Sequence, residues 1–204
     1  MHLQTFSNKQ AFIQASTDLV LQHKVIALSG GRTPLPIYQE LAKHDLSKMQ
    51  FYQVDERYVS LEDPASNAGM ILENLKPHHF THFDTTLGIE EALADYETKL
   101  QGVQFDLCVL GIGRDGHFAS LFPYSEALQE TSSPVAHTES SDGTDRLTLT
   151  LEPILSSKKI LVLLQGKDKL EVLHELQHPS KEAITFPAKE LLKHENMVVY
   201  YCES

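Results

Sequence analysis

The apolar run at residues 105–110 leads directly into a glycine-rich segment at residues 111–117. A continuous apolar run of strand length is typical of a strand buried on both faces, as in a parallel sheet. Parallel strands are joined by crossover connections, and such sheets bind ligands at the carboxyl ends of their strands. The run therefore predicts an α/β protein, and it marks Asp115 and His117 as candidate functional residues.

Apolar runs and amphipathic segments alternate along the rest of the chain. We expect further strands at residues 24–28, 50–54, 134–137, 147–150, 159–164 and 196–201. We expect one helix from a capping box of Ser7 and Gln10 through Val20, and a second with Thr33 as its N-cap and Pro34 at its first position, running to about His44. Further helices are expected from Ser66, as the cap, to about Leu75, at 89–100 and at 167–177. This alternation predicts one α/β domain over residues 1–204, with a doubly wound, mostly parallel, Rossmann-like sheet and helices on both faces.

Charge and composition exclude several classes of protein. A formal net charge of −11 argues against a nucleic-acid partner, which needs a basic surface. No window approaches the ~20 apolar residues of a membrane span, so we expect no membrane partner. The first residues show no secretory signal, and Cys108 and Cys202 make no disulfide framework, so we expect a cytoplasmic protein. The sequence does not show whether the protein pairs with itself, and a monomer is favoured.

The chain has only four arginines, and three of them follow predicted strands. These three are Arg32, Arg57 and Arg114, and the fourth is Arg146. A guanidinium group offers fixed paired donors that suit phosphate or carboxylate oxygens. An acidic protein that keeps its arginines in loops can focus positive potential in one cleft. We therefore expect a small anionic ligand.

The loop Ser29-Gly30-Gly31-Arg32-Thr33 leads straight from a predicted strand into a predicted helix. Unpaired amide groups and the positive end of the helix dipole favour a phosphate there, and the hydroxyls of Ser29 and Thr33 can add donors. The loop lacks the spacing of a nucleotide P-loop, so a single sugar-linked phosphate fits better than a triphosphate. An ordinary capped turn remains the alternative.

The glycines at 111, 113 and 116 also match the G-x-G-x-x-G pattern of dinucleotide-binding folds. Against that interpretation, Asp115 would bring a carboxylate towards a pyrophosphate. Pro123 would end a helix begun at Gly116 within about two turns. Glu130, the acid roughly 20 residues downstream, lies in a predicted loop. We therefore expect no nicotinamide cofactor; a purely structural turn remains open.

Taken in order, these segments resemble the 6-phosphogluconolactonase family. The matching motifs are Ser29-Gly30-Gly31 with Thr33-Pro34, Val54-Asp55-Glu56-Arg57 with Ser66-Asn67, residues 110–113, 115–117, 119–123 and 146–150, and Gly166 followed by Lys169. They span about residues 28–173. The resemblance implies hydrolysis of 6-phosphoglucono-δ-lactone to 6-phosphogluconate in the oxidative pentose phosphate pathway, with a sugar phosphate as the only small-molecule partner and no cofactor.

Lactone hydrolysis requires an activated water, a stabilised oxyanion and a proton for the leaving oxygen. Because histidine changes charge near neutral pH, we predict that His117 is the general base, and the resemblance implies the same role. We predict that Arg57 stabilises charge on the carbonyl oxygen or orients the sugar. Asp55 is expected to position Arg57, His117 or a hydroxyl, and Asp115 to orient the imidazole or to stabilise its loop.

The predicted phosphate-binding residues complete the candidate site. They are Ser29, Gly30, Gly31 and Thr33, and we expect Arg146 and Lys169 to complete the phosphate-binding site. Departures from the family pattern are Arg32 in place of a small hydroxyl residue, Phe118 in place of threonine and Ser60 in place of proline. Arg32 and Phe118 are the departures that bear on substrate preference, and the sequence does not show how strongly they affect it. The chain holds eleven histidines, but His78, His79 and His82 lie in a predicted exposed loop, so no metal site is predicted.

Two other functions stay open. The glucosamine-6-phosphate deaminases share the Ser-Gly-Gly and Asp-Gly-His loops, but they typically have an aromatic residue at the position of Arg57 and continue to Asn-Glu-Pro where this chain has Ser-Leu-Phe-Pro at 120–123. A non-catalytic sugar-phosphate sensor is the second alternative. Such regulators usually carry a basic DNA-reading unit, and the intact Asp-Gly-His loop favours an enzyme.

Overall fold

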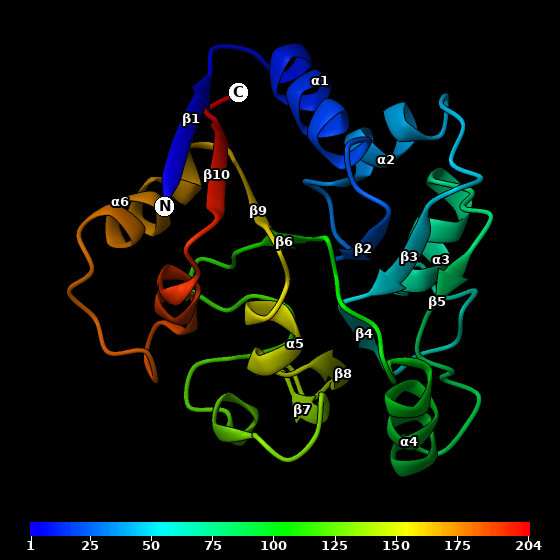
Figure 1. Cartoon of the computed structure of the whole chain (residues 1–204). Helices are drawn as coiled ribbons and strands as arrows, with labels where there is room; N and C mark the ends of the chain where they lie inside the picture. The colour runs from blue at the N-terminus through cyan, green and yellow to red at the C-terminus, as the bar shows by residue number, and fades with distance from the viewer.

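The computed structural model describes residues 1–204, and strands alternate with helices along the chain (Figure 1). The strands are β1 (His2–Phe6), β2 (Val25–Leu28), β3 (Gln50–Gln53), β4 (Asp55–Arg57), β5 (Phe80–Thr81), β6 (Leu107–Gly111), β7 (Val135–Glu139), β8 (Asp145–Leu149), β9 (Ile160–Gln165) and β10 (Met197–Cys202). The α-helices are α1 (Lys9–Val20), α2 (Leu35–Leu41), α3 (Asn67–Asn74), α4 (Ile89–Lys99), α5 (Leu151–Leu155) and α6 (Leu170–Gln177). Short 3₁₀ helices lie at η1 (Glu126–Gln129), η2 (Lys167–Lys169) and η3 (Pro187–Lys193).

The main sheet has seven strands in the order β1-β10-β9-β6-β2-β3-β5. Every neighbouring pair in it is parallel, which confirms the predicted mostly parallel sheet. The sheet is doubly wound because the chain moves from β2 outward to β3 and then returns to place β6 on the other side of β2. The loops that follow β2 and β6 therefore lie next to each other at this switch point, where open α/β sheets bind ligands.

Alternate residues of the central strands enter two separate cores. On β6, Leu107 and Val109 pack with apolar residues of α1, α2 and α3 on one face. Cys108 and Leu110 pack on the other face with residues of α4, α5, α6 and the second sheet. Helices therefore cover both faces, as predicted, and both faces of a central strand need apolar residues. None of the helices has the length and apolar character needed to span a membrane.

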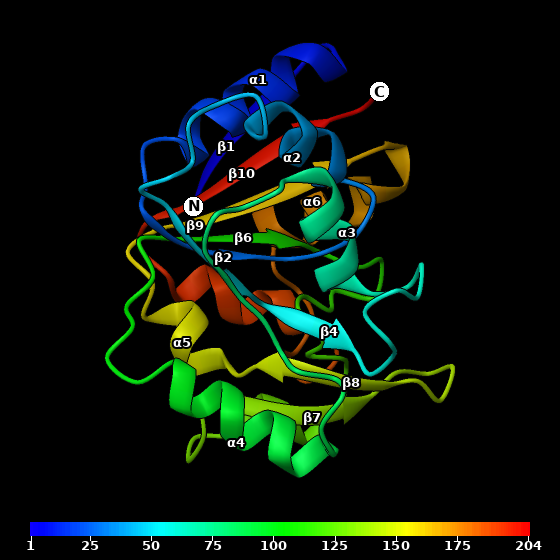
Figure 2. The same ribbon diagram turned by 90° about the vertical axis from the view of Figure 1, so that its right-hand side faces the viewer.

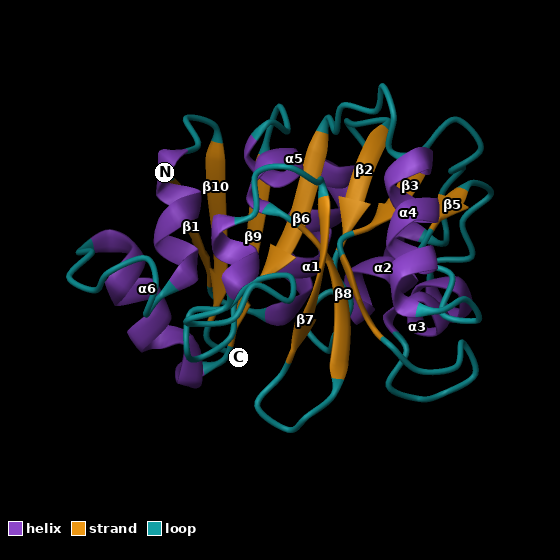
Figure 3. Ribbon diagram, turned by 90° about the horizontal axis from the view of Figure 1, so that it is seen from below, coloured by secondary structure: helices purple, strands orange, loops and turns teal.

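A second sheet of three antiparallel strands, β4-β8-β7, packs beneath the main sheet. Figure 2 shows β7 and β8 below the main sheet beside α4, while α1 and α2 lie above it. Figure 3, seen from below, shows β7 and β8 in front of the central part of the main sheet. Strands β7 and β8 match predicted strands, but this separate sheet was not predicted, because β4 is only three residues long and polar. Through β4, the second sheet carries Asp55 and Arg57.

Two helix starts differ from the predictions. Helix α1 is capped by Asn8, whose side chain accepts a hydrogen bond from the Ala11 amide at 2.9 Å, and not by Ser7. Helix α2 begins at Leu35 with no side-chain cap, so Thr33 is not its N-cap, and it ends at Leu41 and not near His44. The expected cap of α3 is confirmed, because Ser66 Oγ accepts from the Gly69 amide at 3.0 Å.

Besides β4, two short strands lie outside the predicted ones. Strand β1 pairs in parallel with β10 at the edge of the main sheet, so the first and last strands lie side by side while the N- and C-terminus lie at opposite ends of the pair (Figure 1). The histidine-rich segment contains the two-residue strand β5. No three His, Cys, Asp or Glu side chains of the chain come together in a way that could hold a metal ion.

Candidate active site

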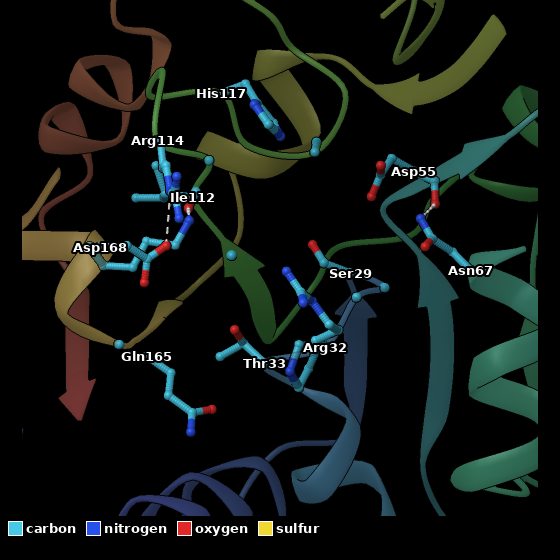
Figure 4. A pocket seen from close by; sticks show the side chains of 18 of the residues that line it. Ser29, Arg32, Thr33, Asp55, Asn67, Ile112, Arg114, His117, Gln165 and Asp168 are labelled. Carbon is cyan, nitrogen blue, oxygen red and sulfur yellow. Dashed lines mark hydrogen bonds and ion pairs between the residues drawn. The ribbon is translucent and has the colours of Figure 1, made fainter. Parts of the chain in front are cut away.

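A cleft of about 710 Å³ lies at the carboxyl ends of the central strands. Only two of its 21 lining residues are hydrophobic, so it suits a polar ligand. Loops that follow β2, β6 and β9 form it together with β4 and the start of α3 (Figure 4). The predicted site residues that line it are Ser29, Gly30, Gly31, Thr33, Asp55, Arg57, His117 and Lys169.

The loop after β2 presents unpaired donors to the cleft. The amide groups of Gly30, Gly31, Arg32 and Thr33 donate to no backbone oxygen of the chain. Ser29 Oγ is buried without a hydrogen-bond partner, while the Ser29 carbonyl accepts from the Tyr38 hydroxyl at 2.6 Å. Gly31 has φ +103°, a conformation that residues with a side chain rarely adopt. Because Thr33 does not cap α2, its hydroxyl remains available to a ligand in this loop.

Lys169 ties the loop after β9 to the loop after β6. Its Nζ donates to the Ile112 carbonyl at 2.7 Å. Burial lowers the pKa of Lys169; Asp168 opposes this shift, and the neighbouring Arg114 adds to it. Arg114 Nε in turn contacts Asp168 Oδ2 at 3.0 Å. These contacts place three charged side chains around one end of the cleft, with Arg32 close enough to add to the lowering of the Lys169 pKa.

His117 is held by a neighbouring carboxylate. Its Nδ1 donates to Asp115 Oδ1 at 2.6 Å, and its backbone amide donates to the same oxygen at 3.2 Å. Burial opposes ionisation of Asp115. The hydrogen bond from His117, and the positive charge of the imidazole when it is protonated, outweigh burial, so the pKa of Asp115 is lowered. A carboxylate only accepts hydrogen bonds, so the neutral imidazole carries its proton on Nδ1 and leaves Nε2 free to accept one. This arrangement suits a general base.

The imidazole lies directly over Gly113. A Cβ added at Gly113 would lie 2.2 Å from His117 Cε1 and 2.6 Å from Asp115 Oδ1. The ring also contacts Phe122, with the two centroids 4.9 Å apart. Gly113 is therefore needed for close approach of the imidazole to the backbone.

Residues 117–120 point alternately into the cleft and into the protein. His117 and Ala119 line the cleft, and Ala119 adopts φ +50°, which is unusual for a residue with a side chain. Phe118 is fully buried in the core between the two sheets and does not line the cleft. The ring of Phe118 therefore makes no direct contact with a ligand in the cleft, and its influence on substrate preference stays untested.

Asp55 is buried at the inner wall of the cleft. Its Oδ2 accepts from Ser120 Oγ at 2.8 Å. Burial raises the pKa of Asp55, although the Ser120 hydrogen bond opposes that shift. Ser120 is itself fixed, since its amide donates to Thr148 Oγ1 at 3.1 Å and its carbonyl accepts from Thr138 Oγ1 at 2.9 Å. Asp55 is therefore a rigidly held carboxylate that can contact a bound sugar.

Glu56 has a structural role that the sequence analysis did not assign. Its buried carboxylate accepts from the amides of Asn67 and Ala68 at 2.7 and 2.8 Å, and from Ser66 Oγ at 3.1 Å. It thereby satisfies the first amides of α3 and complements the helix dipole. Glu56 lies ten residues before the cap Ser66, too far for a local capping signal, so the sequence does not reveal this tertiary contact.

Arg146 lies outside the cleft lining. It sits opposite Arg57 in the β4–β8 register, and its Nη2 donates to Ser140 Oγ at 3.2 Å. Burial and the Arg57 charge lower the pKa of Arg146. The side chain of Arg146 contacts Ser140 in this structure, and its part in phosphate binding stays a prediction.

The fold and the cleft define an α/β protein that binds a small anionic ligand beside a histidine–carboxylate pair. The chain belongs to the family of glucosamine-6-phosphate isomerases and 6-phosphogluconolactonases, whose family model matches residues 7–200.

Individual relatives agree with this family assignment. The chain is 35% identical over 177 residues to a 6-phosphogluconolactonase of Thermotoga maritima, with 80% of each chain covered. A crystal structure of a 6-phosphogluconolactonase from Shewanella baltica superposes with a TM-score of 0.90 at 26% identity, covering 100% of this chain and 98% of that one. A monomeric glucosamine-6-phosphate deaminase shares the fold, with a TM-score of 0.86 at 22% identity and coverage of 99% and 97%. The fold alone therefore does not separate the two activities.

Proposed function

We propose that this protein hydrolyses 6-phosphoglucono-δ-lactone to 6-phosphogluconate in the oxidative pentose phosphate pathway. The observation that carries the proposal is one cleft that combines an open amide loop and Lys169 with the His117–Asp115 pair. The names of the relatives at 35% identity point to the same reaction. Arg57, where deaminases typically have an aromatic residue, also favours the lactonase.

The phosphate of the substrate binds at the loop after β2. The free amides of residues 30–33 donate to its oxygens, and the Ser29 and Thr33 hydroxyls add two further donors. Lys169 supplies positive charge, and Arg32, which has no acidic partner in the chain, adds to it. Charge concentrated here attracts a dianion despite the net charge of −11 on the whole chain.

The lactone ring then reaches towards His117. Nε2 of His117 takes a proton from a water molecule while the water oxygen attacks C1 and the carbonyl oxygen becomes an oxyanion. The Arg57 guanidinium stabilises that negative charge. When the oxyanion collapses, the bond between C1 and the ring oxygen breaks, and the imidazolium returns its proton to the ring oxygen. Asp115 keeps the imidazole in the required orientation throughout.

Asp55 contributes to binding in this proposal. One oxygen already accepts from Ser120, and the carboxylate lines the cleft, so the rest of the group can accept from a sugar hydroxyl. The hydrolysis transfers no electrons between substrate and enzyme, so it needs no redox cofactor. Both cysteines are buried and unpaired, which suits the reducing cytoplasm, where we place the protein. The monomeric state remains a prediction.

A direct assay tests the proposal. Freshly prepared 6-phosphoglucono-δ-lactone is added to the protein, and 6-phosphogluconate is followed through a coupled dehydrogenase and compared with spontaneous ring opening. The proposal requires acceleration that scales with protein concentration. A parallel assay measures ammonia release from glucosamine 6-phosphate; ammonia release without lactone opening would make the deaminase the correct assignment.

A further inference from the structure

The Arg57 guanidinium is held by neutral groups only. Its Nη1 donates to Asn67 Oδ1 and, at 3.0 Å, to the Ala65 carbonyl. The side chain of Arg57 forms no ion pair, although Glu56 is its neighbour in sequence, because the Glu56 carboxylate is used by the start of α3. Arg57 is therefore oriented without losing its positive charge to a carboxylate.

We propose that Asn67 is a positioning residue for the hydrolysis, because its amide group fixes the orientation of Arg57 and leaves the guanidinium charge available to the substrate. This inference rests on the proposed function, in which Arg57 stabilises the oxyanion. An electrostatic stabiliser is effective only when it is already oriented before the charge develops. Asn67 supplies that orientation.

Asn67 is itself rigidly placed. Its side chain is almost fully buried, its Nδ2 donates to the Asp55 carbonyl at 2.9 Å, and its backbone amide donates to Glu56 Oε1 at 2.7 Å. The carboxamide therefore spans from the backbone of β4 to the side chain of Arg57, as Figure 4 shows for its contact with Asp55. With both ends of its side chain engaged, Asn67 has one orientation.

The position of Arg57 makes this support necessary. Arg146 is its direct neighbour across the β4–β8 register, and the two positive charges repel. Without Asn67, the guanidinium retains only the Ala65 carbonyl as an acceptor, and repulsion from Arg146 favours other rotamers. Misplacement of an oriented catalytic donor by about 1 Å can reduce the rate on the order of a hundredfold.

Gly30 connects this support to the phosphate loop. A Cβ added at Gly30 would lie 1.9 Å from Asn67 Oδ1 and 2.7 Å from Asn67 Cβ. Any side chain at position 30 therefore displaces Asn67, so the loop that binds phosphate and the residue that orients Arg57 are packed against each other. This contact explains the absence of a side chain at residue 30, whose φ is ordinary.

Steady-state kinetics of Asn67→Ala, Arg57→Ala and the double variant test the inference. We expect Asn67→Ala to lower kcat about tenfold or more while KM changes less than about threefold, since the lost hydrogen bond involves a charged group. In the Arg57→Ala background, the same change should lower kcat by less than about twofold, because there is no guanidinium left to orient. Asn74→Ala, at the other end of α3 and bonded to Gln39, is the matched control and should leave both constants unchanged.

The outcomes separate the two proposals. If the wild-type protein does not open the lactone, the proposed function fails. If the wild type is active and Arg57→Ala is impaired, but Asn67→Ala retains wild-type kcat or its effect persists in full in the double variant, the Asn67 inference fails alone. Should Asn67→Ala not fold, Asn67→Ser carries the same double-variant comparison with a smaller loss of polar contact. Asn67→Asp, which places a charge against Arg57, should also lower kcat, and wild-type kcat in that variant would refute the role of the neutral amide.

Discussion

Replacing Gly113 with alanine places a methyl group where the His117 imidazole lies. The new Cβ would be 2.2 Å from Cε1 and 2.3 Å from Nδ1 of the ring, whereas ordinary contact begins at 3.4 Å, so the ring must move by about 1.2 Å. Gly113 has no left-handed backbone conformation, so the substitution acts through this contact and not through φ. His117 and Asp115 are both partly exposed, which lets them swing outwards without disturbing the core.

The displacement sets the expected magnitude. A 1 Å error in a catalytic group costs on the order of a hundredfold in rate, which corresponds to ~2.7 kcal/mol of barrier. We therefore expect Gly113→Ala to lower kcat for lactone opening about a hundredfold, with an unchanged circular dichroism spectrum and a Tm within a few degrees of the wild type. The coupled assay, corrected for spontaneous opening, measures kcat and KM separately.

Gly111 provides the matched control for Gly113→Ala. A Cβ added at Gly111, two residues earlier on the same strand end, meets no atom within 4 Å. Gly111→Ala should therefore keep kcat within about threefold of the wild type, and any effect should fall on KM because the residue lines the cleft. Wild-type kcat in Gly113→Ala, or equal losses of kcat in both variants, would refute the placement of the imidazole over Gly113.

Two further predictions follow from charged groups of the cleft. Lys169→Ala should raise KM about tenfold or more, because a charged donor to the phosphate is lost. A smaller fall in kcat is expected, because the hydrogen bond to the Ile112 carbonyl is also lost. An unchanged KM with a greatly reduced kcat would instead assign Lys169 to the chemical step. Burial raises the pKa of Asp55, so this residue's contribution to stability is greatest at low pH and is lost as pH rises through its folded-state pKa. The Tm of Asp55→Asn minus that of the wild type should therefore rise as pH goes from acid to neutral, while the variant loses activity. A fall in that quantity over the same range would contradict the direction of the pKa shift.

The parallel sheet could be predicted because its central strands are continuous apolar runs. Strands such as β6 and β9 are buried on both faces, so their sequences stand out without any knowledge of partners. The edge strand β1 did not stand out, because most of its residues are exposed and its pairing with β10 determines its structure. Strand β4 consists of three charged residues and exists because it pairs with β8.

The candidate site could be predicted wherever a loop follows a central strand. The loops with Ser29 and His117 come together because β2 and β6 are neighbours with the same direction. The direction in which a loop side chain points does not follow from the order of the strands. The sequence therefore did not show that Phe118, next to His117, is buried and does not line the cleft. Asn67 depends on contacts made across the fold, and its role in orienting Arg57 became evident only in the structure.

The most direct test of the account compares turnover and binding in His117→Ala. The variant removes the base but leaves the phosphate loop intact, so titration with 6-phosphogluconate should show an affinity close to that of the wild type. In the coupled assay, opening of 6-phosphoglucono-δ-lactone should fall to the spontaneous rate. Wild-type turnover in this variant would contradict the account. Loss of 6-phosphogluconate binding together with turnover would also contradict it, because the phosphate-binding loop and the imidazole would then not be separate parts of one cleft.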